Sequence, residues 1–435
     1  MLPGNRCKRL AWIVLAIAFG CRLIAAGGVQ TYLNREPGRE FVIAGDAEGY
    51  WELAKDLAHG RDYAVYSPPR RVMRMPAFPA ILAGSIVCFG ESLWAARLVL
   101  ACVGTAACGL VFLLGRALFD ERVGLLASAW TAVSPTLVGF SVLILSETVF
   151  AFAILLQLWL MALLYRRHLE RAAFQSSEGG RRMNLGLAFA VGAAGGFACL
   201  VRPSWLLVPP GIAVLWWWLA GRNRFRMYEA ALLCAGCVAV LTPWTIRNFR
   251  VTGHFVPTTL WMGASLYDGL NPEATGDSDM AFFESDRLAT DRGMTEYAVD
   301  RYYRKLAVDY AFEHPGRAVQ LALVKLGRYW SPWPNADQFR HPLAGGLVFL
   351  SSVPLFVGAA IGIARRQAGG WRGILTAAPI VYFAAIHAVF VGSIRYRLPT
   401  EYPLAVLAAA GIIGVWHSRR GNTMAERTAD AGHRG

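Results

Sequence analysis

The 435-residue chain is short of charge. Only 17% of its residues are Asp, Glu, Lys or Arg, whereas 55% are hydrophobic. Soluble domains carry about 25% charged residues, so this composition excludes an ordinary soluble domain. Apolar runs of about 20 residues recur along the chain, which is the length that crosses a hydrocarbon core. Because the short alternating strands of a membrane barrel are missing, we predict an all-α polytopic membrane protein.

Signature motifs of several enzyme classes are also missing. The chain has no glycine-rich dinucleotide fingerprint and no Walker loop, which argues against a nucleotide cradle. It has neither the Gly-x-Ser-x-Gly motif nor the His-Glu-x-x-His motif of common hydrolases. His254, His314 and His387 stand alone in the sequence, so a histidine metal site is not expected.

Cysteine is absent from the long polar region at 247–341. Nearly all of the eight cysteines lie in apolar runs, and no disulfide framework is implied. The pair Cys234 and Cys237 has the spacing of half a metal or redox motif. Since no second pair accompanies it, packing of small residues on an apolar helix is the better interpretation.

The net charge of +14 has a distribution typical of membrane proteins. Its basic residues cluster in short segments between apolar runs, where the positive-inside rule places them. No nucleic-acid-binding motif accompanies them, and a nucleic-acid partner is not expected.

The apolar runs predict about ten transmembrane helices. They lie at Leu10–Gly28, Leu93–Leu118, Val123–Val138, Glu147–Tyr165, Leu185–Leu200, Trp205–Ala220, Tyr228–Trp244, Leu343–Ala364, Ile374–Val391 and Tyr402–His417. The first run is too long for the core of a cleaved signal peptide, and more spans follow. We interpret it as a retained signal-anchor.

The loop charges predict one orientation. With the N-terminus inside, the cytoplasmic segments hold Arg6, Lys8, Arg9, Arg116, Arg122, Arg166, Arg167, Arg171, Arg181, Arg182, Arg222, Arg224, Arg226, Arg365, Arg366, Arg372, Arg419, Arg420, Arg427 and Arg434. The short outer loops hold only Arg202, Arg395 and Arg397. This imbalance predicts that both termini are cytoplasmic. The preference for Arg over Lys and the short loops suit a bacterial inner membrane, with the outer loops in the periplasm.

Two regions outside the spans are long, and the whole chain, 1–435, is predicted to be a single domain. The first, 28–92, contains the apolar segment Pro76–Phe89, which is too short for a span and is expected to be an interfacial or re-entrant helix. Trp51–Leu57 has the spacing of an interfacial helix. The second region, 245–342, is expected to contain a helix at Thr295–Tyr310 and to face the acceptor.

Acidic residues lie at the outer ends of predicted spans, where a carboxylate is costly near lipid and usually marks a site. Asp46 and Glu48 follow the first span, with Tyr50 close behind. Such a pair can hold a divalent cation, act as a general base or simply be solvated, and all three stay open. Glu147 begins the fourth span, where capping by Ser146 and the helix dipole also explain it. We take Asp46 and Glu147 as candidate catalytic residues, and Glu48 and Tyr50 as candidate substrate-binding residues.

Arginines recur on the same face. A single arginine at the end of a span often only snorkels to lipid headgroups. Three such sites on a face poor in basic charge favour phosphate capture, because the planar guanidinium binds phosphate oxygens in pairs and stays charged. The candidates for substrate binding are Arg202, Arg247, Asn248, Arg395 and Arg397. An outward-facing site has no access to cytoplasmic nucleotide sugars, so an activated group would arrive on a lipid.

The order of short motifs resembles the GT-C superfamily of lipid-dependent glycosyltransferases. It is most similar to bacterial relatives of dolichyl-phosphate-mannose–protein mannosyltransferases and to lipid A aminoarabinose transferases. The residues that carry the resemblance are Asp46 with Tyr50, Arg74-Met75-Pro76-Ala77-Phe78-Pro79, Ala95-Ala96-Arg97-Leu98, Gly115-Arg116-Ala117-Leu118-Phe119, Ser134-Pro135, Leu145-Ser146-Glu147, Arg202-Pro203, Pro243-Trp244-Thr245-Ile246-Arg247-Asn248 and Arg395-Tyr396-Arg397-Leu398-Pro399. Together they cover most of the chain from Ala44 to about Pro403.

The resemblance implies a fold and a reaction. Asp46 would take the proton from an acceptor hydroxyl that attacks the anomeric carbon of the sugar, with inversion. The polyprenyl phosphate would leave, stabilised by arginines such as Arg74, Arg247 and the Arg395/Arg397 pair. The acceptor would be a protein, lipid or glycan. The chain departs from relatives that have an Asp-Glu pair, because Ala47 separates Asp46 from Glu48, so the role of Glu48 and of a divalent cation stays open.

Other functions are also consistent with an outward-facing charged site. A transporter or flippase of lipid-linked sugars would carry charged residues at mid-membrane and broken helices. A polymerase or ligase of surface saccharides would share the outward site and its arginines. A non-catalytic assembly factor would tolerate the loss of Asp46. The charged first outer region followed by spans with short loops favours the glycosyltransferase.

Overall fold

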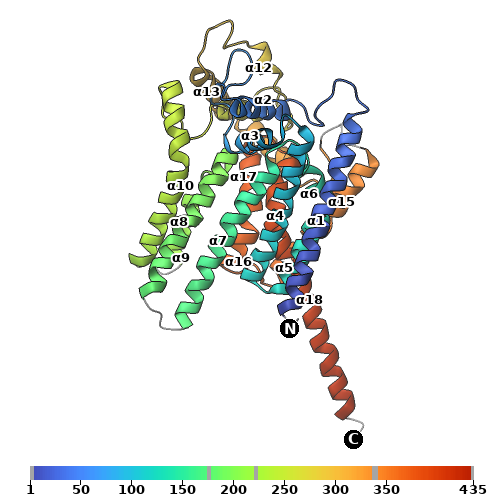
Figure 1. Cartoon of the computed structure of the whole chain (residues 1–435). Helices are drawn as coiled ribbons and strands as arrows, with labels where there is room; N and C mark the ends of the chain where they lie inside the picture. Colours follow the sequence, from blue (N-terminus) through green and yellow to red (C-terminus); the bar gives the residue numbers. More distant parts are fainter. Residues whose placement is uncertain (1–3, 174–177, 220–223, 336–340, 433–435) are drawn as a thin grey trace.

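The computed structural model describes residues 4–173, 178–219, 224–335 and 341–432. Within these residues the regular secondary structure is helical, apart from one isolated bridge between Val65 and Arg70. The bundle consists of α1 (Gly4–Leu33), α4 (Leu93–Leu118), α5 (Glu121–Val133), α6 (Pro135–Phe140), α7 (Glu147–Ala173), α8 (Glu178–Val201), the 3-10 helix η1 (Pro203–Trp205), α9 (Val208–Leu219), α10 (Arg224–Thr252), α15 (Pro342–Ala364), α16 (Trp371–Thr376), α17 (Ala378–Val389) and α18 (Ile394–Gly432). Both ends of the chain lie at the same end of this bundle (Figure 1).

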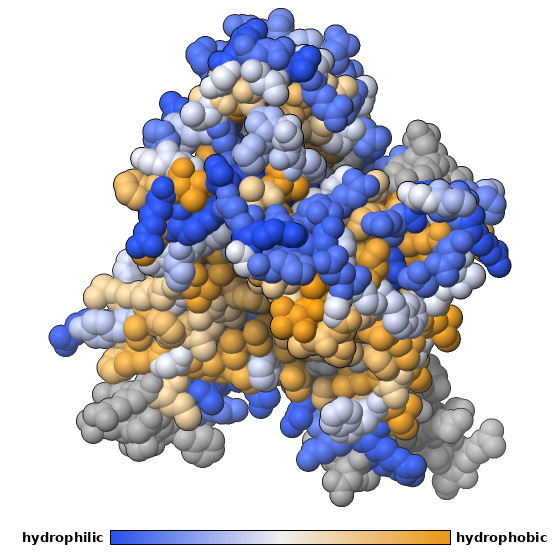
Figure 2. Space-filling view, turned by 45° about the horizontal axis from the view of Figure 1, so that its top comes forward, coloured by the Kyte–Doolittle hydropathy of each residue, from blue (hydrophilic) through white to orange (hydrophobic). Residues whose placement is uncertain are grey.

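Seven of the described helices are long and apolar enough to cross a membrane, in agreement with an all-α integral membrane protein. They are Arg6–Leu33, Leu93–Leu118, Glu147–Glu170, Met183–Val201, Arg224–Thr252, Pro342–Ala364 and Ile394–Trp416. Figure 2 shows the corresponding apolar band across the middle of the molecule, below a hydrophilic cap. Large side chains exposed in the bundle, such as Trp12 and Ile24 on α1, therefore face lipid rather than water.

Three expected spans are interrupted, and in each case proline lies at the break. The expected helix at Val123–Val138 stops at Ser134, whose extended backbone precedes Pro135 at the start of α6. The expected helix at Ile374–Val391 is divided at Ala377, before Pro379 in the first turn of α17. The expected helix at Trp205–Ala220 is shortened to α9, because Pro209 and Pro210 favour a helix start over a helix interior.

A cap of shorter helices covers the end of the bundle opposite the chain termini. These helices are α2 (Asp46–Ala58), α3 (Ala77–Phe89), α11 (Met262–Gly269), α12 (Ala281–Ser285), α13 (Glu296–Glu313) and α14 (Pro315–Trp330). Figure 1 shows α2, α3, α12 and α13 together at this end. The helices expected at 76–89, 51–57 and 295–310 are thus present as α3, α2 and α13, while α14 was not anticipated. It packs against α17 and α18.

Side-chain caps define several helix starts. The hydroxyl of Ser92 accepts a hydrogen bond from the backbone N–H of Ala95 at the start of α4, and Thr295 does the same for Ala298 at the start of α13. Asp120 accepts from two backbone N–H groups at the start of α5. Each cap satisfies amides that the helix itself leaves unpaired, which explains why these helices begin where they do.

Glycines bring α8 and α10 into direct backbone contact. A Cβ atom added at Gly192 would lie 1.8 Å from the carbonyl oxygen of Leu233, and one added at Gly236 would lie 2.2 Å from that of Phe189. Small residues of this kind let membrane helices approach closely. Because lipid is as apolar as the helix surfaces, such helices associate through van der Waals packing and not through the hydrophobic effect. The α8–α10 pair therefore depends on these two positions having no side chain.

We expect Gly192→Ala to destabilise the protein by about 1–3 kcal/mol, because the methyl group must push two backbones apart. The measurement is thermal unfolding of purified protein in detergent. Gly186→Ala is the matched control on the same helix, since no atom lies within 4 Å of the position its Cβ would occupy. Equal melting temperatures for the two variants would contradict the close contact.

Candidate active site

The first turn of α2 places Asp46 at the capped end of the bundle. Gly45, with φ of 66°, turns the chain into the helix in a conformation that other residues rarely adopt. On its inner face α2 buries Tyr50 and Trp51, and the Tyr50 ring meets Phe78 of α3 edge-on at 4.8 Å. Since α3 packs against this face of α2, packing helps to fix the position of the Asp46 carboxylate.

Two arginines bind the two oxygens of Asp46. Arg74, between α2 and α3, donates to Oδ1 at 2.6 Å, and Arg395, at the start of α18, pairs with Oδ2 at 2.8 Å. The Asp46 side chain remains 32% exposed. Burial alone raises the pKa of Asp46, but the charges of Arg74 and Arg395 outweigh it and hold that pKa well below its usual range. Asp46 is therefore a carboxylate at every physiological pH.

Glu147 extends the cluster into the bundle. It is the first residue of α7 and is buried, and its Oε1 accepts from Arg202 at 3.0 Å and from Nε of Arg395. Arg395 thus bridges two carboxylates, one on α2 and one on α7. The second oxygen of Glu147, Oε2, has no hydrogen-bond partner among the described residues. Five separate segments of the chain meet in this ion-pair cluster of Asp46, Arg74, Glu147, Arg202 and Arg395.

Aromatic rings flank the ion-pair cluster. The Arg74 guanidinium lies 4.8 Å from the centre of the Tyr50 ring, and that of Arg202 lies 5.5 Å from the Tyr396 ring. Tyr396 in turn stacks on His387 with ring centres 4.3 Å apart. Such contacts orient guanidinium groups without neutralising them. Tyr396 was not singled out from the sequence, although it stands between Arg395 and Arg397 in the quoted motif.

The cluster has more positive than negative charge. Three arginines face two carboxylates, which leaves one positive charge without a counter-charge inside the cluster. All five residues lie at the ends of helices or in the loops that join them. Arginine binds phosphate oxygens through paired hydrogen bonds, so this end of the bundle has the charge and the donors to hold a phosphate group.

Comparison with known proteins places this geometry in context. Residues 73–246 match the family model described as dolichyl-phosphate-mannose-protein mannosyltransferase. The archaeal oligosaccharyltransferase AglB from Archaeoglobus fulgidus, solved with an inhibitory peptide and a dolichol-phosphate, superposes with a TM-score of 0.59 at 15% identity, over 97% of this chain and 52% of that chain. The apo form of the A. fulgidus oligosaccharyltransferase gives 0.58 at 15% identity, over 99% and 52%. The chain therefore shares the fold of these oligosaccharyltransferase structures over the part that superposes.

A further solved structure and the lengths of the matched chains show how far the similarity extends. ArnT from Cupriavidus metallidurans, solved with undecaprenyl phosphate, gives a TM-score of 0.43 at 15% identity, over 92% of this chain and 77% of that chain. The chain spans about half the length of the oligosaccharyltransferase structures that it matches. No sequence among the curated proteins matches it. The family match includes Arg74, Glu147 and Arg202, whereas Asp46 and Arg395 lie outside it.

Two residues proposed from the sequence for phosphate capture do not join the ion-pair cluster. Arg247 donates to the carbonyl oxygens of Arg71 at 2.5 Å and Tyr63 at 3.2 Å. Asn248 donates to the carbonyl oxygens of Val256 and Thr258. These bonds fasten the end of α10 to the segments around it. Glu48 is exposed on α2, and no contact between it and the ion-pair cluster is present among the described residues.

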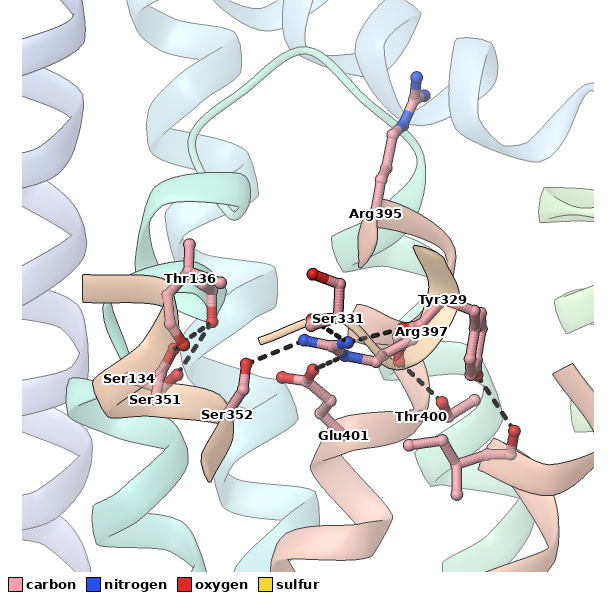
Figure 3. A network of polar contacts seen from close by, with 12 residues as sticks. Ser134, Thr136, Tyr329, Ser331, Ser351, Ser352, Arg395, Arg397, Thr400 and Glu401 are labelled. Carbon is pink, nitrogen blue, oxygen red and sulfur yellow. Dashed lines mark hydrogen bonds and ion pairs between the residues drawn. The ribbon is translucent and has the colours of Figure 1, made fainter. Parts of the chain in front are cut away.

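Arg397 also lies apart from the cluster, deep among the helices (Figure 3). Its nitrogens donate to the carbonyl oxygens of Tyr329 at 2.6 Å and Ser331 at 2.8 Å, and to the hydroxyl of Ser352 at 2.9 Å. Its Nε pairs with Glu401 at 2.6 Å. Figure 3 shows Arg395 pointing away from this network. Residues two apart on a helix face opposite sides, which explains why the two arginines of one motif have different surroundings.

We expect Arg397→Met to destabilise the protein by about 3–5 kcal/mol, because it leaves Glu401 as an unpaired buried charge. The double variant Arg397→Met/Glu401→Gln should recover much of that loss. Thermal unfolding in detergent measures both.

Arg287→Gln is the control, because it breaks an exposed ion pair with Asp291 at 3.7 Å. Exposed pairs contribute about 0–1 kcal/mol. A similar effect of the two single variants would show that the Arg397 network is not rigid.

Divalent cations in proteins are held mainly by oxygen ligands, among which carboxylates are prominent. Among the described residues, no three His, Cys, Asp or Glu side chains lie close enough to hold a metal ion. Both oxygens of Asp46 are engaged by arginines, and Glu48 is exposed away from them. This donor set does not fit a divalent cation, and no reaction step is assigned to one.

Proposed function

We propose that the protein is a membrane glycosyltransferase that moves a sugar from a polyprenyl-phosphate donor to an acceptor hydroxyl, with inversion at the anomeric carbon. The observation that carries the proposal is the Asp46 carboxylate held between Arg74 and Arg395, with Arg395 also bound to Glu147. The family match and the GT-C fold support it. So do the ligands of the two named relatives, a dolichol-phosphate in AglB and undecaprenyl phosphate in ArnT.

The arginines would bind the phosphate of the donor. Arg74 and Arg395 are both partly exposed, at 14% and 17% of their side chains, so a ligand can reach them. An incoming phosphate would compete with Asp46 for their N–H groups, and the surplus positive charge of the cluster favours the exchange. As the bond between the anomeric carbon and the phosphate oxygen breaks, the same groups would stabilise the negative charge on the leaving phosphate.

Asp46 would then serve as the general base. In the absence of donor its two ion pairs make it a weak base, since they stabilise the carboxylate. When the phosphate draws Arg74 and Arg395 away, the pKa of Asp46 rises and the carboxylate can accept the proton of the acceptor hydroxyl. The acceptor oxygen bonds to the anomeric carbon and the polyprenyl phosphate leaves. Donor binding therefore prepares the base that the acceptor needs.

Glu147 has a different part in this scheme. Its side chain is only 2% exposed, so an acceptor hydroxyl cannot readily reach it. It holds Arg202 and Arg395 at the end of the bundle and is best described as a positioning residue. This differs from the catalytic candidacy that its place in the sequence suggested.

We further propose that the site faces the periplasm of a bacterial inner membrane, with both termini in the cytoplasm. The segregation of basic residues supports this orientation. The region 245–342, which contributes α11–α14 to the cap, is the proposed acceptor side. The acceptor belongs to one of three classes: protein, lipid or glycan.

We expect Asp46→Asn to lower the transfer rate by about 10²–10⁴-fold, the usual contribution of a general base. The assay follows label from radiolabelled undecaprenyl-phosphate sugars to an envelope acceptor fraction, with purified protein. Glu48→Gln is the matched control on the same helix, because Glu48 is exposed and outside the cluster. Comparable turnover by the Asp46→Asn variant and the wild type would exclude Asp46 as the base.

We expect Arg74→Gln to weaken binding of undecaprenyl phosphate by about 10–100-fold, since a hydrogen bond to a charged group contributes about 1.5–3 kcal/mol. Binding of the lipid phosphate to purified protein measures this without the sugar. Arg247→Gln is the control, because its guanidinium donates to backbone carbonyls outside the cluster. If Arg247→Gln loses affinity and Arg74→Gln keeps it, the phosphate binds near α10 instead.

A further inference from the structure

A second basic site lies at the other end of the bundle. A cavity of about 490 Å³ opens there between the end of α4, the C-terminal part of α7 and the start of α16. Its walls include Arg116, Phe119, Tyr165, Arg166, Leu169 and Arg372. Tyr165 follows Glu147 by 18 residues along the single helix α7, which is about 27 Å at the rise of an α-helix. The cavity is therefore separate from the ion-pair cluster.

The lining of this basic cavity is positively charged and contains no acidic side chain. Arg372 is held in place, because its Nε donates to the carbonyl oxygen of Leu118 at 3.0 Å and its guanidinium lies 5.0 Å from the centre of the Phe119 ring. The bond to Leu118 also offsets the negative end of the α4 dipole, which would otherwise repel an anion.

The other two arginines are only loosely paired. Arg116 lies 3.7 Å from Glu121 and Arg166 lies 3.5 Å from Glu170, and all four side chains are substantially exposed. Ion pairs of this kind are weak in water and exchange readily for a better acceptor. A phosphate group is such an acceptor, because its oxygens take charge-assisted hydrogen bonds from more than one guanidinium.

The cavity lies where lipid headgroups are expected. Two helices that can cross the membrane, Leu93–Leu118 and Glu147–Glu170, end beside it. Tyr165 packs near Trp371 with ring centres 6.3 Å apart, and such amphipathic rings favour the boundary between hydrocarbon and water. Leu169 adds an exposed apolar side chain to the rim. A ligand with a phosphate and an apolar body would match both parts of this lining.

We propose that the basic cavity binds the phosphate of an anionic phospholipid headgroup. Arg116, Arg166 and Arg372 would share the phosphate oxygens, while the acyl chains continue along the apolar surface of the bundle. Basic cavities between membrane helices at the headgroup level bind anionic lipids by this chemistry. The membrane supplies such lipids at high local concentration, which favours them over free phosphate. The inference does not depend on the proposed glycosyl transfer.

The test is native mass spectrometry of the full-length protein in detergent, titrated with phosphatidylglycerol, phosphatidylcholine or inorganic phosphate. We expect the tightest lipid site to prefer phosphatidylglycerol over phosphatidylcholine by at least tenfold. Arg116→Gln/Arg166→Gln should lower the affinity for phosphatidylglycerol by at least tenfold while keeping the bond of Arg372 to Leu118. Arg116→Lys/Arg166→Lys should recover part of the loss.

The charge-matched control is Lys8→Gln/Arg9→Gln, which removes two exposed basic residues at the same end of the bundle but outside the cavity. We expect its affinity for phosphatidylglycerol to stay within twofold of the wild type. Equal binding of both phospholipids would overturn the proposal, and so would unchanged binding by Arg116→Gln/Arg166→Gln. Inorganic phosphate that displaces phosphatidylglycerol at equal concentration would also overturn it, by making the cavity a site for free anions.

Discussion

The bridge that Arg395 makes between Asp46 and Glu147 is the interaction on which the site depends. One carboxylate belongs to α2 in the cap and the other to α7 in the bundle, so the bridge joins the two layers of the molecule. Without it, Asp46 would keep only Arg74 and the buried Glu147 would keep only Arg202 as an ion-pair partner. An ionised group in such surroundings is tolerated only when it is paired and hydrogen-bonded. The folding of α2, α7 and α18 against one another is therefore tied to the charge balance of the site.

The same bridge explains how a site can be both stable and reactive. Without a ligand the two acids are paired with the arginines, which lowers the free-energy cost of keeping these charges near lipid. In the proposed reaction, the one surplus positive charge favours an anion, and the anion that binds would release a carboxylate. Stability and reactivity would then be two states of one network, and the phosphate of the proposed donor would switch between them.

Much of the architecture follows from the sequence, because apolar runs and loop charges report directly on membrane spans. The length of an apolar run does not predict the interruptions before Pro135 and Pro379, although proline marks both breaks. Asp46, Glu147, Arg202 and Arg395 were all candidates from their place at the ends of spans, and they meet in space.

The remaining residues needed three-dimensional information. Arg395 and Arg397 belong to one short motif, and the sequence does not distinguish them. They face different sides of α18, so Arg395 joins the ion-pair cluster and Arg397 pairs with Glu401. The backbone bonds of Arg247 depend on how distant loops fold over α10. Arg74 was a candidate only through the family resemblance, and its contact with Asp46 was not predicted, since no local pattern joins residues 28 positions apart.

The shortness of α9 has a consequence for the surrounding bilayer. Its 12 residues extend about 18 Å, well below the hydrocarbon thickness of about 30 Å. Val214 and Trp218 on this helix are exposed to lipid. Acyl chains that meet so short an apolar surface must compress or tilt to cover it. The bilayer beside the described part of α9 therefore meets a shorter apolar surface than it does beside α10, which packs next to α9 and is long enough to cross a membrane.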